Sequence, residues 1–243
     1  MQTALESTAV AKLQARLRGE VIRPGDARYE QARHVWNGRV NRYPALIVYC
    51  AAPSDVRTTI DFARSFGLPI TVRGGGHSMV GFSVRDGALV LDLSHLKGMQ
   101  IDPGTGIARV QAGLTLGEFV RATQVYGLAT TTGTVAGTGM GGLTLGGDIG
   151  WLMGTYGLTI DSLLSAHLVT ADGQRLSASA SEHPDLFWGL RGGGGNFGVA
   201  TAFTFQGTSG ASRTAVGSSQ GALATAGQLL QRSQQHQPGP GGL

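Results

Sequence analysis

The 243-residue sequence contains a single cysteine, Cys50, and no apolar run long enough to cross a membrane. A single cysteine excludes an internal disulfide and a cysteine-based metal cluster. Because Cys50 ends the apolar run that begins at Leu46, we predict that it is a small residue of the core. The first 20 residues are polar and charged and have no apolar core of signal-peptide length. We therefore expect a soluble, cytoplasmic protein that does not bind a membrane.

Clusters of basic residues are also missing. The formal net charge of +4 comes mostly from scattered arginines, and there is no basic run or basic patch with interleaved aromatic residues. Nucleic-acid binding therefore has little support. None of the 6 histidines belongs to an H-x-x-x-H or H-E-x-x-H pattern, so the sequence predicts no metal site.

Glycine, in contrast, is abundant, with 40 residues, which is far above average usage. The glycines cluster at 74–76, 133–150 and 192–198 and show no collagen-like period. With 41% hydrophobic residues, the chain can form a sizeable core between such segments. The clusters therefore indicate loops that approach something closely, because a residue without a Cβ lets the backbone come near.

The first glycine cluster follows an apolar run rich in β-branched residues. Residues 70–72 predict a buried strand that stops abruptly at the glycines. Successive glycines can take positive φ and turn their amides toward one point, which makes an anion-binding nest suited to a phosphate or pyrophosphate. A short motif of this kind also occurs in ordinary surface turns. The residues of the loop are Gly74, Gly75, Gly76, His77 and Ser78.

The residues before this loop predict a βαβ unit. Residues 45–50 predict a strand, and an apolar stripe from Val56 to Ala63 predicts a helix that ends near Gly67. The strands of such a unit are parallel. The nest would then lie at the carboxyl end of the second strand, which is where ligands usually bind in α/β sheets.

Further along the chain, the sequence predicts more strands and short helices. Thr115 and Glu118 form a capping-box pattern that predicts the start of a helix. Between 129 and 150, glycine and threonine exclude a long helix and favour tight turns beside a flat ligand. A strand is expected over 87–93, and hairpins are expected over 99–111 and 163–178.

Two glycine patterns match the Rossmann fingerprint G-x-G-x-x-G. The first match consists of Gly137, Gly139 and Gly142. Asp161 lies at nearly the right distance beyond it to hold a ribose. A Rossmann fingerprint must open a helix, whereas further glycines follow at once here, and the second match, which starts at Gly193, fails for the same reason. NAD(P) binding by a Rossmann domain is therefore the weaker alternative.

Residues 73–83, RGGGHSMVGFS, resemble the flavin-attachment loop of the FAD-linked oxidases of the vanillyl-alcohol oxidase and berberine-bridge-enzyme superfamily. Residues 133–150 and 191–199 resemble two further signatures of that family, in the same order. The resemblance extends from about Arg23 to Phe205 and implies an α+β fold. This fold would be a PCMH-type FAD-binding domain, with FAD between two α/β subdomains.

The resemblance also implies a division into domains. Residues 1–22 would be an N-terminal extension, 23–206 the FAD-binding domain and 207–243 a low-complexity, disordered tail. The two subdomains would span about 23–102 and 103–206. Family members continue after this point into a substrate domain that usually carries the catalytic base. The chain therefore looks like a truncated flavin domain, and the sequence does not identify the catalytic residues.

The family pattern assigns roles to individual residues. His77 would attach FAD covalently, since a neutral imidazole is a good nucleophile near neutral pH, and residues from Arg73 to Ser78 would hold the pyrophosphate. Val199 would lie by the adenine. Some relatives attach the flavin to a second residue, a cysteine, whose position is Val135 here, so we expect attachment through His77 alone. The residues expected to line the flavin are Gly133, Thr134, Thr138, Gly139 and Gly142.

Two positions depart from the family pattern. Asp148 stands where relatives usually have a glycine, and Gly154-Thr155 replaces an Arg-Lys pair. Burying a carboxylate without a partner is costly. We therefore expect Asp148 to be exposed or hydrogen-bonded.

The function that the resemblance implies is that of a flavin-dependent oxidase. Such an enzyme passes a hydride from a small-molecule substrate to FAD, and molecular oxygen then reoxidises the flavin. The sequence identifies neither the substrate nor the oligomeric state. A flavin-binding remnant without catalytic activity is the alternative from another functional class.

Overall fold

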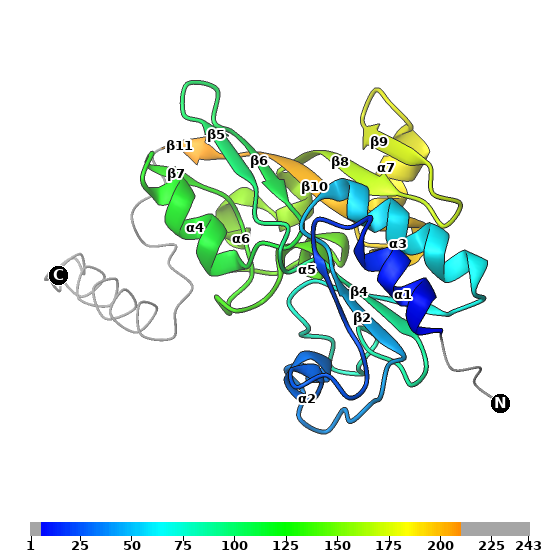
Figure 1. The fold of residues 1–243 in the computed structure, drawn as a ribbon. Helices are drawn as coiled ribbons and strands as arrows, with labels where there is room; N and C mark the ends of the chain where they lie inside the picture. The colour runs from blue at the N-terminus through cyan, green and yellow to red at the C-terminus, as the bar shows by residue number, and fades with distance from the viewer. Residues whose placement is uncertain (1–5, 210–243) are drawn as a thin grey trace, which may run out of the picture.

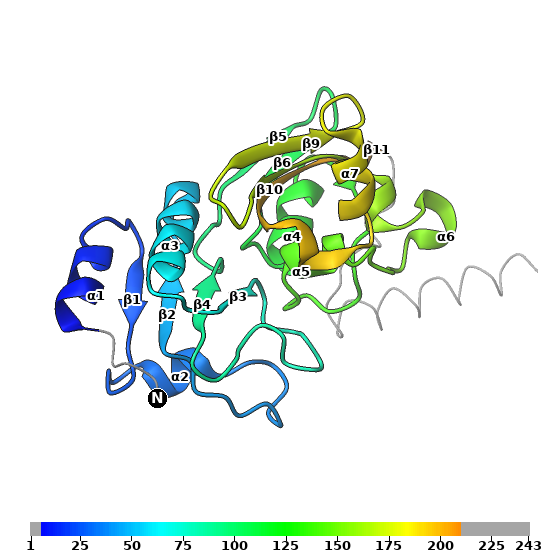
Figure 2. The ribbon, with the colours of Figure 1, turned by 90° about the vertical axis from the view of Figure 1, so that its right-hand side faces the viewer.

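The computed structural model describes residues 6–209, which form two large β-sheets, a small two-stranded sheet and helices packed on them (Figure 1). One large sheet comes from the N-terminal part of this range and the other from the remainder, and the two lie next to each other (Figure 2). The predicted α+β class is confirmed. From residue 210 onward, the predicted tail lies outside the described residues.

The first sheet is mainly parallel, with the strand order β1-β2-β4-β3. Strand β4 (Leu89–Asp92) lies between β2 (Leu46–Tyr49) and β3 (Ile70–Arg73) and is parallel to both. Strand β1 (Glu20–Ile22) pairs with β2 in the antiparallel sense. Helix α3 (Pro53–Ser65) connects β2 to β3, so the predicted βαβ unit is confirmed.

The N-terminal elements pack on this sheet. Helix α1 (Ser7–Gln14) contacts α3 and buries Val10 and Leu13 in the main core. Helix α2 (Tyr29–Arg33) packs on the opposite face of the sheet with Tyr29 and Ala32 buried. The described part of the predicted N-terminal extension is thus packed on the first subdomain.

The middle of the sheet, formed by strands β2 and β4, is stabilised by apolar packing on both of its faces. Strand β2 is a short continuous apolar run and β4 is apolar as far as Leu91, and β4 is buried along its whole length. Leu46 and Leu91 belong to the main core on one face, whereas Ile47 and Val90 belong to a smaller core on the other. Strands covered on both faces carry such runs instead of an alternating pattern.

Strand β3 differs from the prediction of a buried strand. It forms the edge of the sheet, and Val72 is 39% exposed. Residues 70–72 of this strand line a cavity between the sheets, which is described below. The strand is therefore apolar because it forms a cavity wall, and not because it lies inside the core.

The second sheet is antiparallel, with the strand order β5-β6-β10-β8-β9. Both predicted hairpins are confirmed as β5–β6 and β8–β9. Strand β5 already belongs to this sheet, so the chain passes from the first sheet to the second before Met99. The predicted subdomain boundary near residue 102 would instead lie inside the β5–β6 hairpin. The strands are β5 (Met99–Asp102), β6 (Ile107–Gln111), β8 (Leu163–Val169), β9 (Arg175–Ser179) and β10 (Val199–Gln206).

Short helices accompany the second sheet. Helix α4 (Leu116–Gln124) begins with the predicted capping box, in which the Glu118 amide donates to Thr115 Oγ1 and the Thr115 amide donates to Glu118 Oε2. The two-residue strands β7 (Leu128–Ala129) and β11 (Thr208–Ser209) pair, although no strand was predicted after residue 206. The remaining elements are α5 (Met140–Leu145), α6 (Met153–Tyr156), α7 (Pro184–Leu190) and the 3₁₀ turns η1 (Thr159–Asp161) and η2 (Gly194–Phe197).

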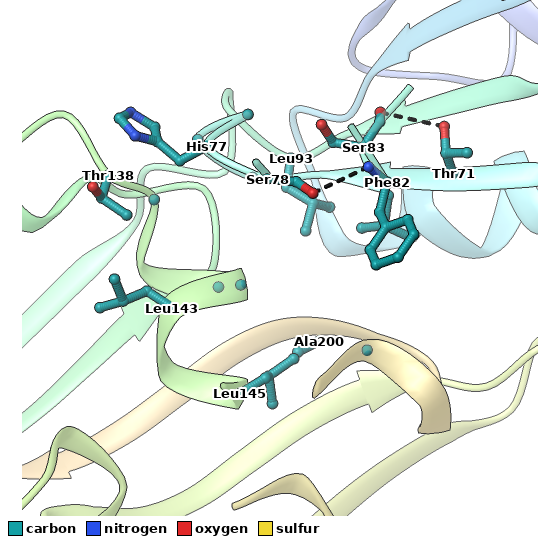
Figure 3. A pocket seen from close by; sticks show the side chains of 18 of the residues that line it. Thr71, His77, Ser78, Phe82, Ser83, Leu93, Thr138, Leu143, Leu145 and Ala200 are labelled. Carbon is teal, nitrogen blue, oxygen red and sulfur yellow. Dashed lines mark hydrogen bonds between the residues drawn. The ribbon is translucent and has the colours of Figure 1, made fainter. Parts of the chain in front are cut away.

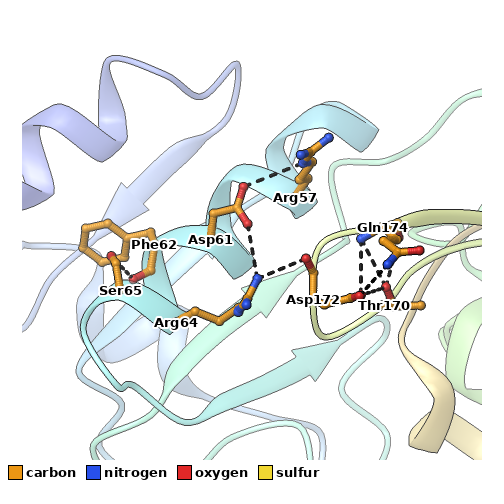
Figure 4. A network of polar contacts seen from close by, with 8 residues as sticks. All are labelled: Arg57, Asp61, Phe62, Arg64, Ser65, Thr170, Asp172 and Gln174. Carbon is orange, nitrogen blue, oxygen red and sulfur yellow. Dashed lines mark hydrogen bonds and ion pairs between the residues drawn. The ribbon is translucent and has the colours of Figure 1, made fainter.

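A polar contact joins the two halves at the side of the molecule (Figure 4). Arg64 on α3 donates a hydrogen bond from Nη1 to the main-chain oxygen of Asp172, in the turn between β8 and β9, at 3.0 Å. The same guanidinium lies 4.0 Å from Asp61 Oδ1, one turn earlier on α3. This contact helps to fix how the first subdomain sits against the second.

Three further sequence expectations concern the described residues. Cys50 is fully buried, as predicted, and burial raises the pKa of its thiol to about 12. Among residues 6–209, no group of three or more His, Cys, Asp or Glu side chains is placed to hold a metal ion. In the same range, no helix is long and apolar enough to span a membrane.

Candidate functional site

A cavity of about 740 Å³ lies where the two sheets meet (Figure 3). One wall is the edge strand β3 with the glycine loop that follows it. The other wall is the glycine-rich approach to α5, together with η2 and the first residues of β10. The cavity therefore brings together the three glycine clusters of the sequence, which come from both subdomains.

The first glycine loop lines the cavity and has unused main-chain amides. Within residues 6–209, no amide from Gly74 to Ser78 donates a hydrogen bond. Only Gly76 has positive φ, at 70°, so the expectation of positive φ at successive glycines is wrong. Gly75 is needed for another reason, because a Cβ there would lie 2.3 Å from the amide nitrogen of Gly139 on the opposite wall.

His77 lies at the end of the loop and is half-buried. It is the only titratable side chain among the residues that line the cavity. Its Nε2 points toward Gly137, where an added Cβ would lie 3.7 Å away, and neither ring nitrogen hydrogen-bonds to any residue between 6 and 209. Both nitrogens are thus available to a ligand.

Arg73 does not line the cavity, although the sequence groups it with the pyrophosphate-binding residues. Its side chain is 6% exposed and forms a buried ion pair with Asp92, which is 3% exposed. The guanidinium also donates to the main-chain oxygen of His34 at 3.4 Å. Arg73 therefore supports the glycine loop from behind.

On the opposite wall, Thr138, Gly139 and Gly142 line the cavity. A Cβ on Gly142 would meet no atom within 4 Å, so this position opens onto free space. Gly133 and Thr134, which were also expected beside the flavin, are not among the lining residues.

Near the predicted adenine position, Val199 itself is 6% exposed, belongs to the main core and is not among the lining residues. Its neighbours Gly198 and Ala200 are the residues that reach the wall. This offset by one residue follows from the alternation of side chains along β10.

The first G-x-G-x-x-G match does open a helix, contrary to expectation, because Gly139 is the N-cap of α5. That helix has only 6 residues. Moreover, the sheet behind it is antiparallel, whereas a Rossmann domain is built on a parallel, doubly wound sheet. The fold therefore gives the NAD(P) alternative no support.

Asp148 is partly buried and hydrogen-bonded, as one of the two expected alternatives requires. Its Oδ2 lies 2.6 Å from Thr159 Oγ1, and its backbone has φ of 61°. Burial raises the pKa of the Asp148 carboxyl, while hydrogen bonds from Thr159 and the main chain act in the opposite direction. The carboxyl oxygen lies beside Gly133, where a Cβ would come within 3.0 Å of it.

Several lining residues were given no individual role from the sequence, although most of them lie within the family signatures at 73–83, 133–150 and 191–199. Most of them are glycines or apolar residues, which offer no chemical reason to single them out, and the polar ones are Thr71, Ser83 and Asn196. Ser83 differs from the other lining residues, because its hydroxyl is buried and has no hydrogen-bond partner in the described part of the chain. The additional lining residues are Ile70, Thr71, Val72, Phe82, Ser83, Leu93, Gly141, Leu143, Leu145, Gly195, Asn196, Gly198 and Ala200.

Comparison with known protein families identifies the group. Residues 44–179, more than half of the chain, match the family described as FAD binding domain. The chain belongs to this family. An uncharacterised FAD-linked oxidoreductase of Bacillus subtilis is 40% identical to this FAD binding domain over 196 residues, which cover 79% of the chain and 44% of that relative. The (R)-6-hydroxynicotine oxidase of Paenarthrobacter nicotinovorans is 40% identical over 190 residues, covering 78% and 42%.

Solved structures agree with this assignment. The FAD binding domain superposes on 6-hydroxy-D-nicotine oxidase from Arthrobacter nicotinovorans with a TM-score of 0.78 and 39% identity, covering 79% of this chain and 43% of the other. The Physcomitrella patens BBE-like 1 protein gives a TM-score of 0.79 with 30% identity, covering 82% and 44%. The fold is that of PCMH-type FAD-binding oxidases. The chain spans less than half the length of these relatives.

Proposed function

We propose that the cavity between the sheets holds FAD and that its diphosphate lies against the amides of Gly74 to Ser78. The observation that carries this proposal is that these residues line a space that both subdomains enclose and that their amides donate no hydrogen bond within residues 6–209. Such amides bind an anion through aligned dipoles. The cavity lining has no lysine or arginine, so the phosphates would be held by main-chain groups and hydroxyls, with the unpartnered Ser83 hydroxyl among the candidates.

The second part of the proposal is that His77 attaches the flavin covalently. His77 lines the cavity with both ring nitrogens free among the described residues. A glucooligosaccharide oxidase from Acremonium strictum, 31% identical with a TM-score of 0.78 over 83% of this chain and 43% of that one, is described with a 6-S-cysteinyl, 8α-N1-histidyl FAD. This chain has Val135, and no cysteine lines its cavity. We therefore propose a single histidyl attachment.

The activity that we propose is oxidation of a small organic molecule, with molecular oxygen as the electron acceptor. FAD supplies the hydride-accepting chemistry, and this chain binds and orients it. Relatives and structural neighbours include oxidases of hydroxynicotine and of oligosaccharides, so no single substrate class follows for this protein. A cytoplasmic location is supported by the sequence alone, and cell fractionation tests it.

A second candidate function is flavin binding without turnover. Among the described residues that line the cavity, His77 is the only acid or base, and the proposed attachment would commit this histidine to holding the flavin. The described residues would then hold the cofactor but supply no catalytic base. Bleaching of the bound flavin by substrate under anaerobic conditions distinguishes an oxidase from such a binding unit.

The test of FAD binding and attachment is an absorbance spectrum of the purified protein, followed by acid precipitation. We expect a flavin spectrum and a yellow pellet, and a colourless pellet for His77→Ala. The matched control is His95→Ala, because His95 is exposed and does not line the cavity. A wild-type protein that takes up no added FAD would refute the proposed site. A protein that binds FAD but releases all of it in acid would refute only the attachment.

A further inference from the structure

The segment from His34 to Asn37, here called the clasp, holds the first glycine loop on both sides of His77. The main-chain oxygen of His34 accepts from Arg73 Nη1 at 3.4 Å, before the glycines. The Trp36 amide donates to the main-chain oxygen of Gly76 at 3.1 Å. Beyond His77, Asn37 Nδ2 donates to the main-chain oxygen of Met79 at 2.7 Å. The clasp and the loop are thus one hydrogen-bonded unit.

The indole of Trp36 lies face to face with the imidazole of His77. The ring centroids are 5.3 Å apart and the planes differ by 19°. Trp36 remains 61% exposed, so burial of its ring contributes little to the stability of the fold. Since the described residues give His77 no hydrogen bond, this stack is the contact that fixes the plane of the imidazole, with Nε2 toward Gly137.

The clasp is itself attached to a rigid part of the fold. Arg33, the last residue of α2, is buried and forms an ion pair with Glu30 at 2.6 Å. Its guanidinium also lies 4.2 Å from the centroid of the Tyr43 ring. Tyr29, at the start of α2, is buried and donates from its hydroxyl to the main-chain oxygen of Pro44 at 2.7 Å. Trp36 therefore follows directly after an anchored helix.

We propose that Trp36 is a positioning residue that sets the orientation of the His77 imidazole and thereby speeds covalent attachment of the flavin. The effect on attachment depends on the proposed function, whereas the effect on orientation does not. Attachment needs a nitrogen lone pair, which lies in the ring plane, to point at the carbon that it attacks. A ring held in one plane reaches that geometry more often than a freely turning ring.

The stack has a second effect on the same reaction. Overall, one imidazole N–H and one flavin methyl C–H are replaced by an N–C bond, and dioxygen takes both hydrogens as hydrogen peroxide. While the N–C bond forms, the imidazole gains positive charge until its other nitrogen releases a proton. The face of an indole attracts a cation more strongly than other aromatic faces do. Trp36 therefore stabilises the histidine as the bond is made.

The first experiment measures the orientation of His77 in the full-length protein without flavin. NMR of ¹³C,¹⁵N-histidine-labelled protein should show His77 ring protons shifted upfield by the indole, with nuclear Overhauser contacts to Gly137. In Trp36→Leu both features should disappear, and Trp36→Phe should retain them in part. Trp188→Leu is the matched control, because Trp188 is 80% exposed on α7 and does not line the cavity. Unchanged His77 signals in Trp36→Leu would overturn the proposal.

The second experiment follows attachment after FAD is added to apoprotein in air. Acid-precipitable flavin should form about tenfold more slowly in Trp36→Leu, with non-covalent FAD binding close to wild type and partial recovery in Trp36→Phe. Attachment at the wild-type rate in Trp36→Leu would overturn the role in attachment. If Trp36→Leu no longer binds FAD, Trp36 is structural and the proposal is wrong. If the wild-type protein attaches no flavin, the proposed covalent function fails, and the NMR result still decides the orientation.

Discussion

The two glycine-rich segments that meet at the cavity use glycine for physical reasons that differ only in part. In the first loop, the amides of Gly74 to Gly76 donate no hydrogen bond within residues 6–209 and the glycines line the cavity, while Gly75 also packs closely on Gly139. In the second segment, glycines allow main-chain packing: a Cβ on Gly150 would lie 1.7 Å from the Thr132 oxygen, and one on Gly141 would lie 3.1 Å from the Ala112 oxygen. Close main-chain packing therefore requires glycine in both segments, and only the first loop also leaves a run of amides without a hydrogen-bond acceptor among residues 6–209.

The two segments also differ in how charge supports them. The first loop follows Arg73, whose charge is balanced by Asp92 on the neighbouring strand. The second contains Asp148, which has a hydroxyl and main-chain amides as partners but no cation. One segment is thus supported by a complete ion pair, and the other carries a charge that the fold disfavours.

The largest effect on stability is expected when the ion pair that supports the first loop is broken. Arg73→Leu leaves Asp92 buried without its cation, which should lower the free energy of unfolding by about 3–5 kcal/mol. Arg85→Leu makes the same change at an exposed position and should cost far less. Urea denaturation measures both. Equal stability of the two variants would show that the ion pair does not hold the loop.

The contact between the segments is expected to be the next most sensitive. Gly75→Ala places a methyl group 2.3 Å from the Gly139 nitrogen, so one loop must move, at a cost of about 2–3 kcal/mol and with loss of FAD binding. Gly154→Ala is the control, since a Cβ there would meet nothing within 4 Å. Thermal denaturation and flavin titration measure the two effects. A Gly75→Ala protein as stable as the control would mean that the loops are not in close contact.

A smaller, pH-dependent effect is expected for Asp148→Asn. Because the folded pKa of Asp148 is raised, its protonated form favours folding; this stability is present below about pH 4 and is lost as the pH rises through the folded pKa. The variant should therefore become more stable than wild type toward neutral pH. Each pH unit between the folded and unfolded pKa corresponds to about 1.4 kcal/mol. Parallel stability curves from about pH 4 to pH 8 would contradict this expectation.

The smallest effect on stability is expected for Val135→Cys. Val135 is 53% exposed, so the free energy of unfolding should change by less than about 0.5 kcal/mol. If the position faces the flavin, as the family pattern implies, Val135→Cys should restore part of the acid-precipitable flavin that His77→Ala loses. Val125→Cys, at a site 77% exposed, is the matched control. Both cysteine substitutions are made in the His77→Ala protein. Equal amounts of flavin in the acid pellets of these two double variants would place Val135 away from the flavin.

The sequence predicts the supports of the site better than its walls. The apolar run at 46–49 and the Thr115–Glu118 capping box are local signals, and both elements occur where predicted. The burial of Arg73 could not be foreseen, because it depends on the register that places Arg73 opposite Asp92 in the pairing of β3 with β4. From the sequence alone, an arginine beside a glycine loop is expected to bind a ligand, and only the strand pairing shows that Arg73 binds Asp92 instead.

The closeness of Gly75 and Gly139 could not be predicted for a related reason. The two residues lie far apart in the sequence, and their contact arises only when the two subdomains pack together. Apolar walls such as Leu143 and Ala200 resemble any core residue in the sequence, and only the fold leaves them facing the cavity. The stack of Trp36 on His77 is likewise a tertiary contact with no local pattern.

The single cysteine gives this protein a built-in reporter of local opening. Cys50 is fully buried just after β2, and its raised pKa keeps the thiol protonated and unreactive at neutral pH. A thiol reagent can label it only when the surrounding core opens. The labelling rate therefore measures fluctuations of the first sheet in the unmodified protein. A slower rate with FAD present would reveal how strongly a cofactor that bridges the two sheets holds the first one closed.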